Sequence, residues 1–99
     1  MSLAELREIL AGPCSRHPVK RLTLFGSVAR GDAGEGSDLD LLVQFKELPP
    51  SEYASHYFDL LHEIQDAVGS KVDLLTPSGV TRPSLQRNIR DQGVMVYEA

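Results

Sequence analysis

The sequence lacks features that several classes of protein require. It contains one cysteine, Cys14, so an internal disulfide is excluded and a reducing compartment is expected. No apolar run reaches the roughly 20 residues that a membrane-spanning helix needs. The charged residues Glu5, Arg7 and Glu8 do not fit the start of a signal peptide. We therefore expect a cytoplasmic protein that does not associate with a membrane.

An excess of basic charge is also missing. Ten Lys and Arg stand against 14 Asp and Glu, which gives a net charge of -4, and the one short basic run is VKR at 19–21. Proteins that bind nucleic acid usually carry a basic patch, so RNA or DNA is not expected as a substrate. At 99 residues we expect one domain, residues 1–99, without a separate domain for substrate recognition.

Hydrophobic periodicity and turn residues predict alternating helices and strands. The predicted elements are a helix ending near Gly12 and Pro13, strands at 19–25 and 38–43, a helix from Pro49 to Gly69, a strand at 71–75, a helix from Pro83 to Gly93 with Leu85 and Ile89 buried, and a strand at 94–97. This order predicts an α/β fold, in which a small mixed β-sheet has helices packed mainly on one face.

The segment 26–40, GSVARGDAGEGSDLD, begins with a turn suited to phosphate. Gly26 interrupts a β-branched and apolar run, and Ser27 can cap a short helical turn over Val28 to Gly31. Backbone N–H groups at such a turn form a positive concavity in which phosphate oxygens can bind. Gly26 has no side chain to keep a phosphate away.

Two aspartates follow at strand spacing. Leu39 and Leu41 alternate with Asp38 and Asp40, so the carboxylates share the face opposite the buried leucines. Side chains two residues apart start roughly 6.5 to 7 Å from each other, close enough to converge on a pair of metal ions. Hard carboxylate oxygens in this position suit Mg²⁺.

A third carboxylate, Asp73, lies in the strand KVDLL at 71–75. If this strand pairs with the strand of Asp38, Asp73 faces the same site, where it can bind one metal ion and accept the proton of an incoming hydroxyl. Clustered carboxylates repel one another unless a cation is bound, so a structural role does not account for them. The pattern predicts metal-dependent nucleotidyl transfer.

The pattern of Gly26 and Ser27, ten residues, Asp38, one residue and Asp40 resembles the signature of the polymerase-beta-like nucleotidyltransferase superfamily. The short length and the later VDLL are similar to its minimal nucleotidyltransferase branch, the antitoxin partners of HEPN-domain toxins. The resemblance covers essentially the whole chain. One difference is Val28, where many relatives carry a basic residue.

The resemblance implies an enzyme that uses ATP and two Mg²⁺ ions and releases pyrophosphate. Gly26 and Ser27 would hold the β- and γ-phosphates, Asp38 and Asp40 would bind both ions, and Asp73 would hold the catalytic ion and help to deprotonate the acceptor. The resemblance further implies that the acceptor is a tyrosine of a cognate HEPN toxin, which AMP transfer would inactivate. An antitoxin that acts only by binding its partner is the alternative. Nucleotidyl transfer to a small molecule is less expected, because it would need an additional domain.

Several residues are open to more than one interpretation. Arg30 fits a phosphate contact or a surface cation equally well. The aromatic cluster of Tyr53, Tyr57 and Phe58 fits the core better than a platform for base stacking. The three histidines show no spacing relation to the aspartates and are expected on the surface or on helix faces. They are His17, His56 and His62.

Overall fold

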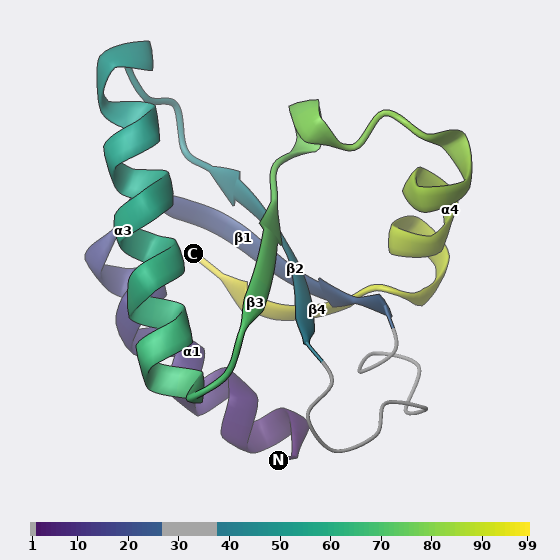
Figure 1. Cartoon of the computed structure of the whole chain (residues 1–99), viewed down its shortest axis with the longest axis horizontal. Helices are drawn as coiled ribbons and strands as arrows, with labels where there is room; N and C mark the ends of the chain where they lie inside the picture. The colour runs from purple at the N-terminus through teal and green to yellow at the C-terminus, as the bar shows by residue number, and fades with distance from the viewer. Residues whose placement is uncertain (1, 27–37) are drawn as a thin grey trace.

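The computed structural model describes residues 2–26 and 38–99, which form helices and strands in the predicted order (Figure 1). The elements are α1 (Leu3–Arg16), β1 (Val19–Phe25), β2 (Leu39–Phe45), α3 (Pro50–Val68), β3 (Val72–Leu75), the short 3-10 helix η1 (Pro77–Gly79), α4 (Pro83–Gln92) and β4 (Val94–Glu98). None of the helices in these two ranges has the length and apolar character needed to cross a membrane.

The four strands form one mixed sheet in the order β3-β2-β1-β4. β1 pairs antiparallel with both β2 and β4, whereas β2 and β3 are parallel. Helix α3 forms the crossover connection between β2 and β3. Parallel neighbours need such a connection because a short hairpin cannot join them. The predicted mixed sheet is confirmed, and β3 becomes an edge strand beside β2.

One face of the sheet is covered by α1 and α3 (Figure 1), and the core lies between them and the strands. Alternate strand residues such as Leu22, Leu41 and Leu74 point into this core, where they meet Leu10 of α1 and Leu60 of α3. The period of two along each strand leaves the intervening residues on the other face. The acidic residues of β2 and β3 lie among these.

Helix α4 lies on the face opposite α1 and α3 (Figure 1). Ile89 of α4 and Leu42 of β2 line the same two cavities. Leu42 points away from the core, because successive strand residues face opposite sides of the sheet and its neighbour Leu41 is fully buried. No residue of α4 is buried, and Leu85 and Ile89 are half-buried rather than buried as predicted. Helices therefore pack mainly on one face, as expected, with α4 as the described exception.

Helix α1 runs about one turn further than predicted and contains Pro13. Pro13 and Cys14 are both buried, and they extend the apolar face that Leu6 and Leu10 begin. The free energy gained by burying this extra turn exceeds the cost of the backbone hydrogen bond that proline cannot donate. Burial also raises the pKa of the Cys14 thiol to about 12, so this cysteine is an inert part of the core.

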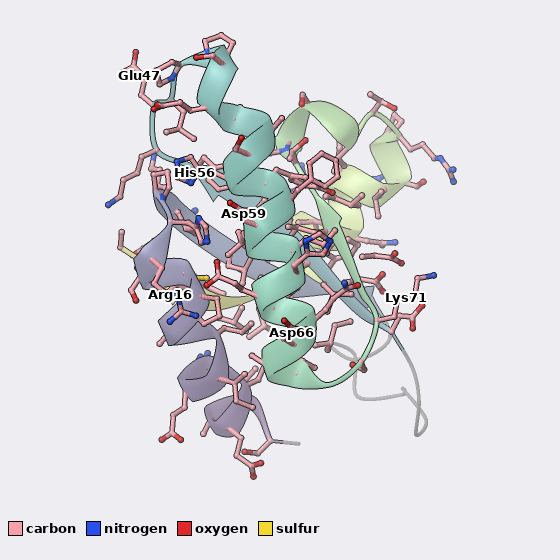
Figure 2. All side chains as sticks on the ribbon, turned by 60° about the vertical axis from the view of Figure 1, so that its left-hand side comes forward. Arg16, Glu47, His56, Asp59, Asp66 and Lys71 are labelled. Carbon is pink, nitrogen blue, oxygen red and sulfur yellow. The ribbon has the colours of Figure 1, made fainter. Side chains whose placement is uncertain are left out.

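The C-terminal end of α1 is joined to the middle of α3 by a polar cluster that the histidine spacing did not predict. Arg16 Nε donates to Glu63 Oε1 at 2.6 Å, and His17 Nε2 contacts the second oxygen of the same carboxylate. His17 Nδ1 lies 3.1 Å from His56 Nδ1. Figure 2 shows Arg16 and His56 along the line where the two helices meet. His17 is thus a largely buried bridge between helices, and not a surface residue.

This cluster predicts how acid affects folding. Contacts from His17 and then Arg16 hold the pKa of Glu63 below its usual range. Such a carboxylate stabilises the fold above its unfolded pKa of about 4.3, and the contribution disappears as the pH falls through the lower folded value. We expect Glu63→Gln to show a smaller loss of melting temperature between neutral and acid pH than the wild type. Glu52→Gln, at an exposed carboxylate of the same helix, is the control, and identical pH profiles for Glu63→Gln and the wild type would contradict the assignment.

Candidate active site

Gly26 directly follows β1 and lies against the side chain of Asp40. It has a φ of 78°, in the left-handed region that favours glycine. A Cβ atom placed there would lie 2.2 Å from Asp40 Oδ2 and 3.0 Å from its Cγ. The contact arises because Phe25, the residue before the turn, pairs with Asp40 across β1 and β2. Both backbone conformation and space therefore require glycine at this position.

Asp40 and Asp73 lie side by side on neighbouring parallel strands. The register of β2 and β3 pairs Asp40 with Asp73, and it pairs Leu41 with Leu74 on the buried face. Adjacent strands are about 4.8 Å apart, so the two carboxylates start from the same row of the sheet. The predicted pairing of KVDLL with the first aspartate strand is confirmed.

Asp38 comes one residue before β2 and contacts a cation that the sequence analysis did not single out. Lys71 Nζ lies 3.9 Å from Asp38 Oδ2, and both side chains are exposed. An exposed ion pair of this kind stabilises by about 0 to 1 kcal/mol, so a competing cation can displace it. The signal for Lys71 was available in the sequence, because it precedes Asp73 by two residues and belongs on the same face of the strand.

Within residues 2–26 and 38–99, no three His, Cys, Asp or Glu side chains are close enough together to hold a metal ion. The backbone nevertheless suits a site for Mg²⁺. Asp40 and Asp73 share a row, and Asp38 lies two residues from Asp40, so rotation of their side chains would bring hard oxygen ligands together. The donor set fits the ion that the sequence predicted.

Two of the predicted nucleotide-binding residues lie outside the described part of the chain. They are Ser27 and Arg30, and the predicted helical turn over residues 28–31 lies there too. Their roles remain predictions. Gly26 is the one member of the predicted phosphate turn that the structure describes.

The three aromatic residues of α3 were expected in the core. Tyr57 packs against it, whereas Tyr53 and Phe58 are not part of it. Tyr53 and Tyr57 are half-buried, and Phe58 is 55% exposed. Burial raises the pKa of Tyr57, and the neighbouring Tyr53 and the negative charge of Asp73 raise it further. Tyr57 therefore keeps its proton, and its hydroxyl donates to the backbone carbonyl of Leu74.

A glycine turn against one strand aspartate, with a second aspartate beside it on a parallel strand, suits the metal-dependent nucleotidyl transfer that the sequence predicts. Comparison with known proteins gives the same class. The nucleotidyltransferase domain family matches residues 6–96, and the chain belongs to this family. It is therefore a nucleotidyltransferase, as the sequence predicted.

Individual relatives agree with this assignment. The Methanocaldococcus jannaschii protein named "Putative protein adenylyltransferase MJ1379" is 33% identical over 99 residues, which cover 96% of this chain and 98% of the relative. A solved structure described as "putative minimal nucleotidyltransferase" is 35% identical, with a TM-score of 0.74 and 95% of each chain covered. A structure of a tri-AMPylated Shewanella oneidensis HEPN toxin in complex with an MNT antitoxin shares the fold, with a TM-score of 0.66 at 17% identity over 99% of this chain and 74% of the other.

Proposed function

We propose that this protein transfers AMP from ATP to a tyrosine hydroxyl of a cognate HEPN toxin and thereby neutralises it. The observation that carries the proposal is the row formed by Gly26, Asp40 and Asp73, which joins a turn suited to phosphate to paired carboxylates. The name of the M. jannaschii relative supports AMP as the group transferred and a protein as its acceptor. The Shewanella complex supports a HEPN toxin as the partner.

In this proposal Asp38, Asp40 and Asp73 would hold two Mg²⁺ ions, which would neutralise charge on the phosphate oxygens and polarise the α-phosphate. The glycine turn supplies the other half of the site. Gly26 lets the backbone turn approach Asp40 closely, and Gly26 and Ser27 would hold the β- and γ-phosphates. These cations would be needed because the carboxylates alone would repel the negative charge of a triphosphate.

Asp73 is the residue that would receive the proton in the reaction. The tyrosine oxygen forms a bond to the α-phosphorus while the bond between that phosphorus and the bridging oxygen of the β-phosphate breaks. Pyrophosphate leaves with the electron pair of that bond. The hydroxyl proton passes to the carboxylate of Asp73, which is exposed on the edge strand and therefore accessible to an acceptor protein.

The direct test is to incubate the chain with Mg²⁺, ATP labelled on the α-phosphate, and a HEPN protein encoded by a neighbouring gene. Label is expected on the partner, and peptide mass spectrometry is expected to place AMP on tyrosine. Omission of Mg²⁺ should abolish the transfer. If the partner is neutralised while it remains unlabelled, the protein acts by binding and the enzymatic proposal is wrong.

A thermal shift measurement tests the metal site without a partner. Mg²⁺ with ATP is expected to raise the melting temperature, since a ligand at 100 times its Kd stabilises the folded state by about 2.7 kcal/mol. Asp38→Asn or Asp40→Asn should remove most of this response, because each replaces a negatively charged carboxylate ligand of Mg²⁺ by a neutral amide. Asp66→Asn, on the outward side of α3 in Figure 2, is the matched control. An equal shift in Asp40→Asn and the wild type would contradict the assigned site.

A further inference from the structure

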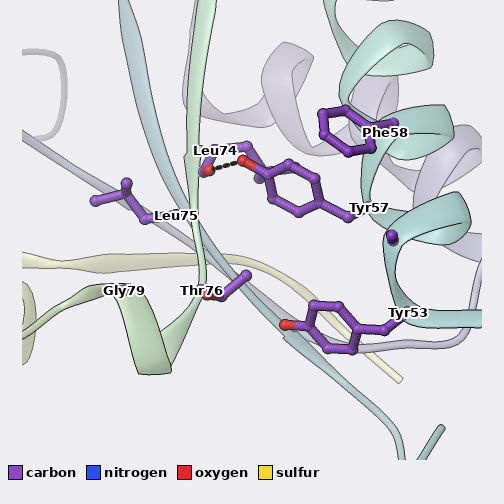
Figure 3. A pocket seen from close by; sticks show the side chains of 8 residues that line it. Tyr53, Tyr57, Phe58, Leu74, Leu75, Thr76 and Gly79 are labelled. Atoms are coloured by element: carbon purple, nitrogen blue, oxygen red, sulfur yellow. Dashed lines mark hydrogen bonds between the residues drawn. The ribbon is translucent and has the colours of Figure 1, made fainter. Parts of the chain in front are cut away.

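A cavity of about 360 Å³ lies at the edge of the sheet, between the first half of α3 and the end of β3 (Figure 3). We call it the edge pocket. Its lining is mostly aromatic and aliphatic. The lining residues are Tyr53, Ala54, Tyr57, Phe58, Leu74, Leu75, Thr76 and Gly79. Its volume is in the range of pockets that hold a side chain or a small ligand.

The walls of the edge pocket are held in place by hydrogen bonds. The hydroxyl of Tyr57 donates to the carbonyl of Leu74, as the dashed line in Figure 3 shows. On the opposite wall, the hydroxyl of Thr76 is 3.2 Å from that of Ser78, outside the lining, and is bonded to it. With these hydroxyls engaged in the wall, the pocket offers mainly apolar surface, including the exposed ring of Phe58. An apolar occupant therefore fits it best.

The edge pocket adjoins the proposed site of proton transfer. Leu75 lines the pocket and follows Asp73 by two residues, so both lie on the same face of β3, about 6.5 to 7 Å apart along the strand. A group bound in the pocket would thus lie beside the acceptor hydroxyl.

The strand order decides from which side the acceptor arrives. Gly26 follows β1, and the order β3-β2-β1 puts Asp73 on the opposite side of Asp40. In-line displacement requires the attacking and leaving oxygens to lie on opposite sides of the phosphorus. With pyrophosphate held at the Gly26 turn, the acceptor hydroxyl must approach from the β3 edge, where the edge pocket lies.

Charge around the edge pocket indicates what kind of segment approaches. Helix α3 contains four acidic residues and no Lys or Arg between positions 50 and 68. Glu63 is engaged by Arg16, whereas Glu52 and Asp59, which are next to the lining residues Tyr53 and Phe58 in the sequence, are exposed. Asp59 directly follows Phe58 on the helix. A segment that carries Lys or Arg near an apolar residue would complement this surface.

We propose that the edge pocket binds an apolar side chain of the acceptor protein, in a basic segment close to the target tyrosine. This inference rests on the proposed function and adds a recognition site to it. Apolar anchors that fill a pocket commonly supply most of the binding energy of an interface. Such an anchor would explain how a single small domain selects one protein as its acceptor.

Two variants of the edge pocket test the inference in opposite ways. Phe58→Ala removes an exposed wall, and Gly79→Leu fills the space. Gly79 does not have a positive φ, and a Cβ atom there would meet only Thr76 Oγ1 at 3.6 Å, so a side chain can begin at this position without backbone strain or a Cβ clash. Each variant is expected to weaken the Kd for the HEPN protein about tenfold or more, as loss of an interface anchor does. The Kd should also rise with salt concentration.

Controls separate this inference from the proposed function. The Mg²⁺ and ATP thermal shift should match the wild type in both variants, and Leu3→Ala, at an exposed apolar residue of α1, should not change the Kd. If both pocket variants bind the HEPN protein with the wild-type Kd, the edge pocket is not its docking site. If ATP affinity falls instead, the pocket holds the nucleotide base and the inference is wrong. If the wild type binds the partner but transfers no AMP, the proposed function fails, and the Kd comparison still tests the pocket.

Discussion

Gly26→Ala is expected to weaken ATP binding by about 100-fold while the protein still folds. The added methyl group would lie 2.2 Å from Asp40 Oδ2, so the carboxylate must move away from the row that it shares with Asp73. Displacing a residue that supports a metal ligand typically costs about 10 to 100-fold in metal affinity. The same methyl group also narrows the space in which the triphosphate is proposed to bind. Isothermal titration with ATP in the presence of Mg²⁺ measures the loss.

Gly69 provides the matched control for this experiment. Its φ of 77° is nearly the same as that of Gly26, but a Cβ atom there would have no neighbour within 4 Å. Both alanine variants therefore carry the same backbone penalty of about 1 to 2 kcal/mol, and only Gly26→Ala disturbs the aspartate. Melting temperatures should fall similarly, whereas ATP affinity should fall in Gly26→Ala alone. Equal ATP affinities in the two variants would overturn the role assigned to Gly26.

The sequence was sufficient for the parts of the site that depend on local pattern. The alternation around Leu39 and Leu41 showed which face carries the aspartates, and the interruption at Gly26 located the turn. The parallel pairing of Asp40 with Asp73 required one further assumption, that the two strands are neighbours. The register confirms it. The contact between Gly26 and Asp40 was not predictable, because it depends on the register of β1 against β2.

Long-range contacts explain the predictions that were wrong. Pro13 was taken as a helix end because proline removes a backbone donor, but tertiary burial of the extra turn keeps it helical. His17 and His56 are 39 residues apart and meet only because α1 and α3 pack together. None of these positions carries a local signal for its environment.

Asp73→Asn is expected to abolish AMP transfer while the complex with the HEPN protein remains intact. The change replaces one carboxylate oxygen by an amide nitrogen, so the acceptor hydroxyl loses its proton acceptor and the site loses a ligand suited to Mg²⁺. Loss of a general base typically costs about 100 to 10,000-fold in rate. Asp73 is exposed on an edge strand and contributes nothing to the core, so folding should be unaffected.

This variant separates an enzyme from a binder because it leaves the edge pocket unaltered. Intact-mass measurement of the partner detects each added AMP as a discrete step, and titration of the two proteins gives the Kd. We expect wild-type Kd, no added mass and a partner that remains toxic. Glu8→Gln, at an exposed carboxylate of α1, tests whether loss of a negative charge alone stops the transfer, and it should retain AMP transfer. If Asp73→Asn and the wild type neutralise the partner equally well and neither adds mass, masking of a surface is the function and the catalytic proposal fails.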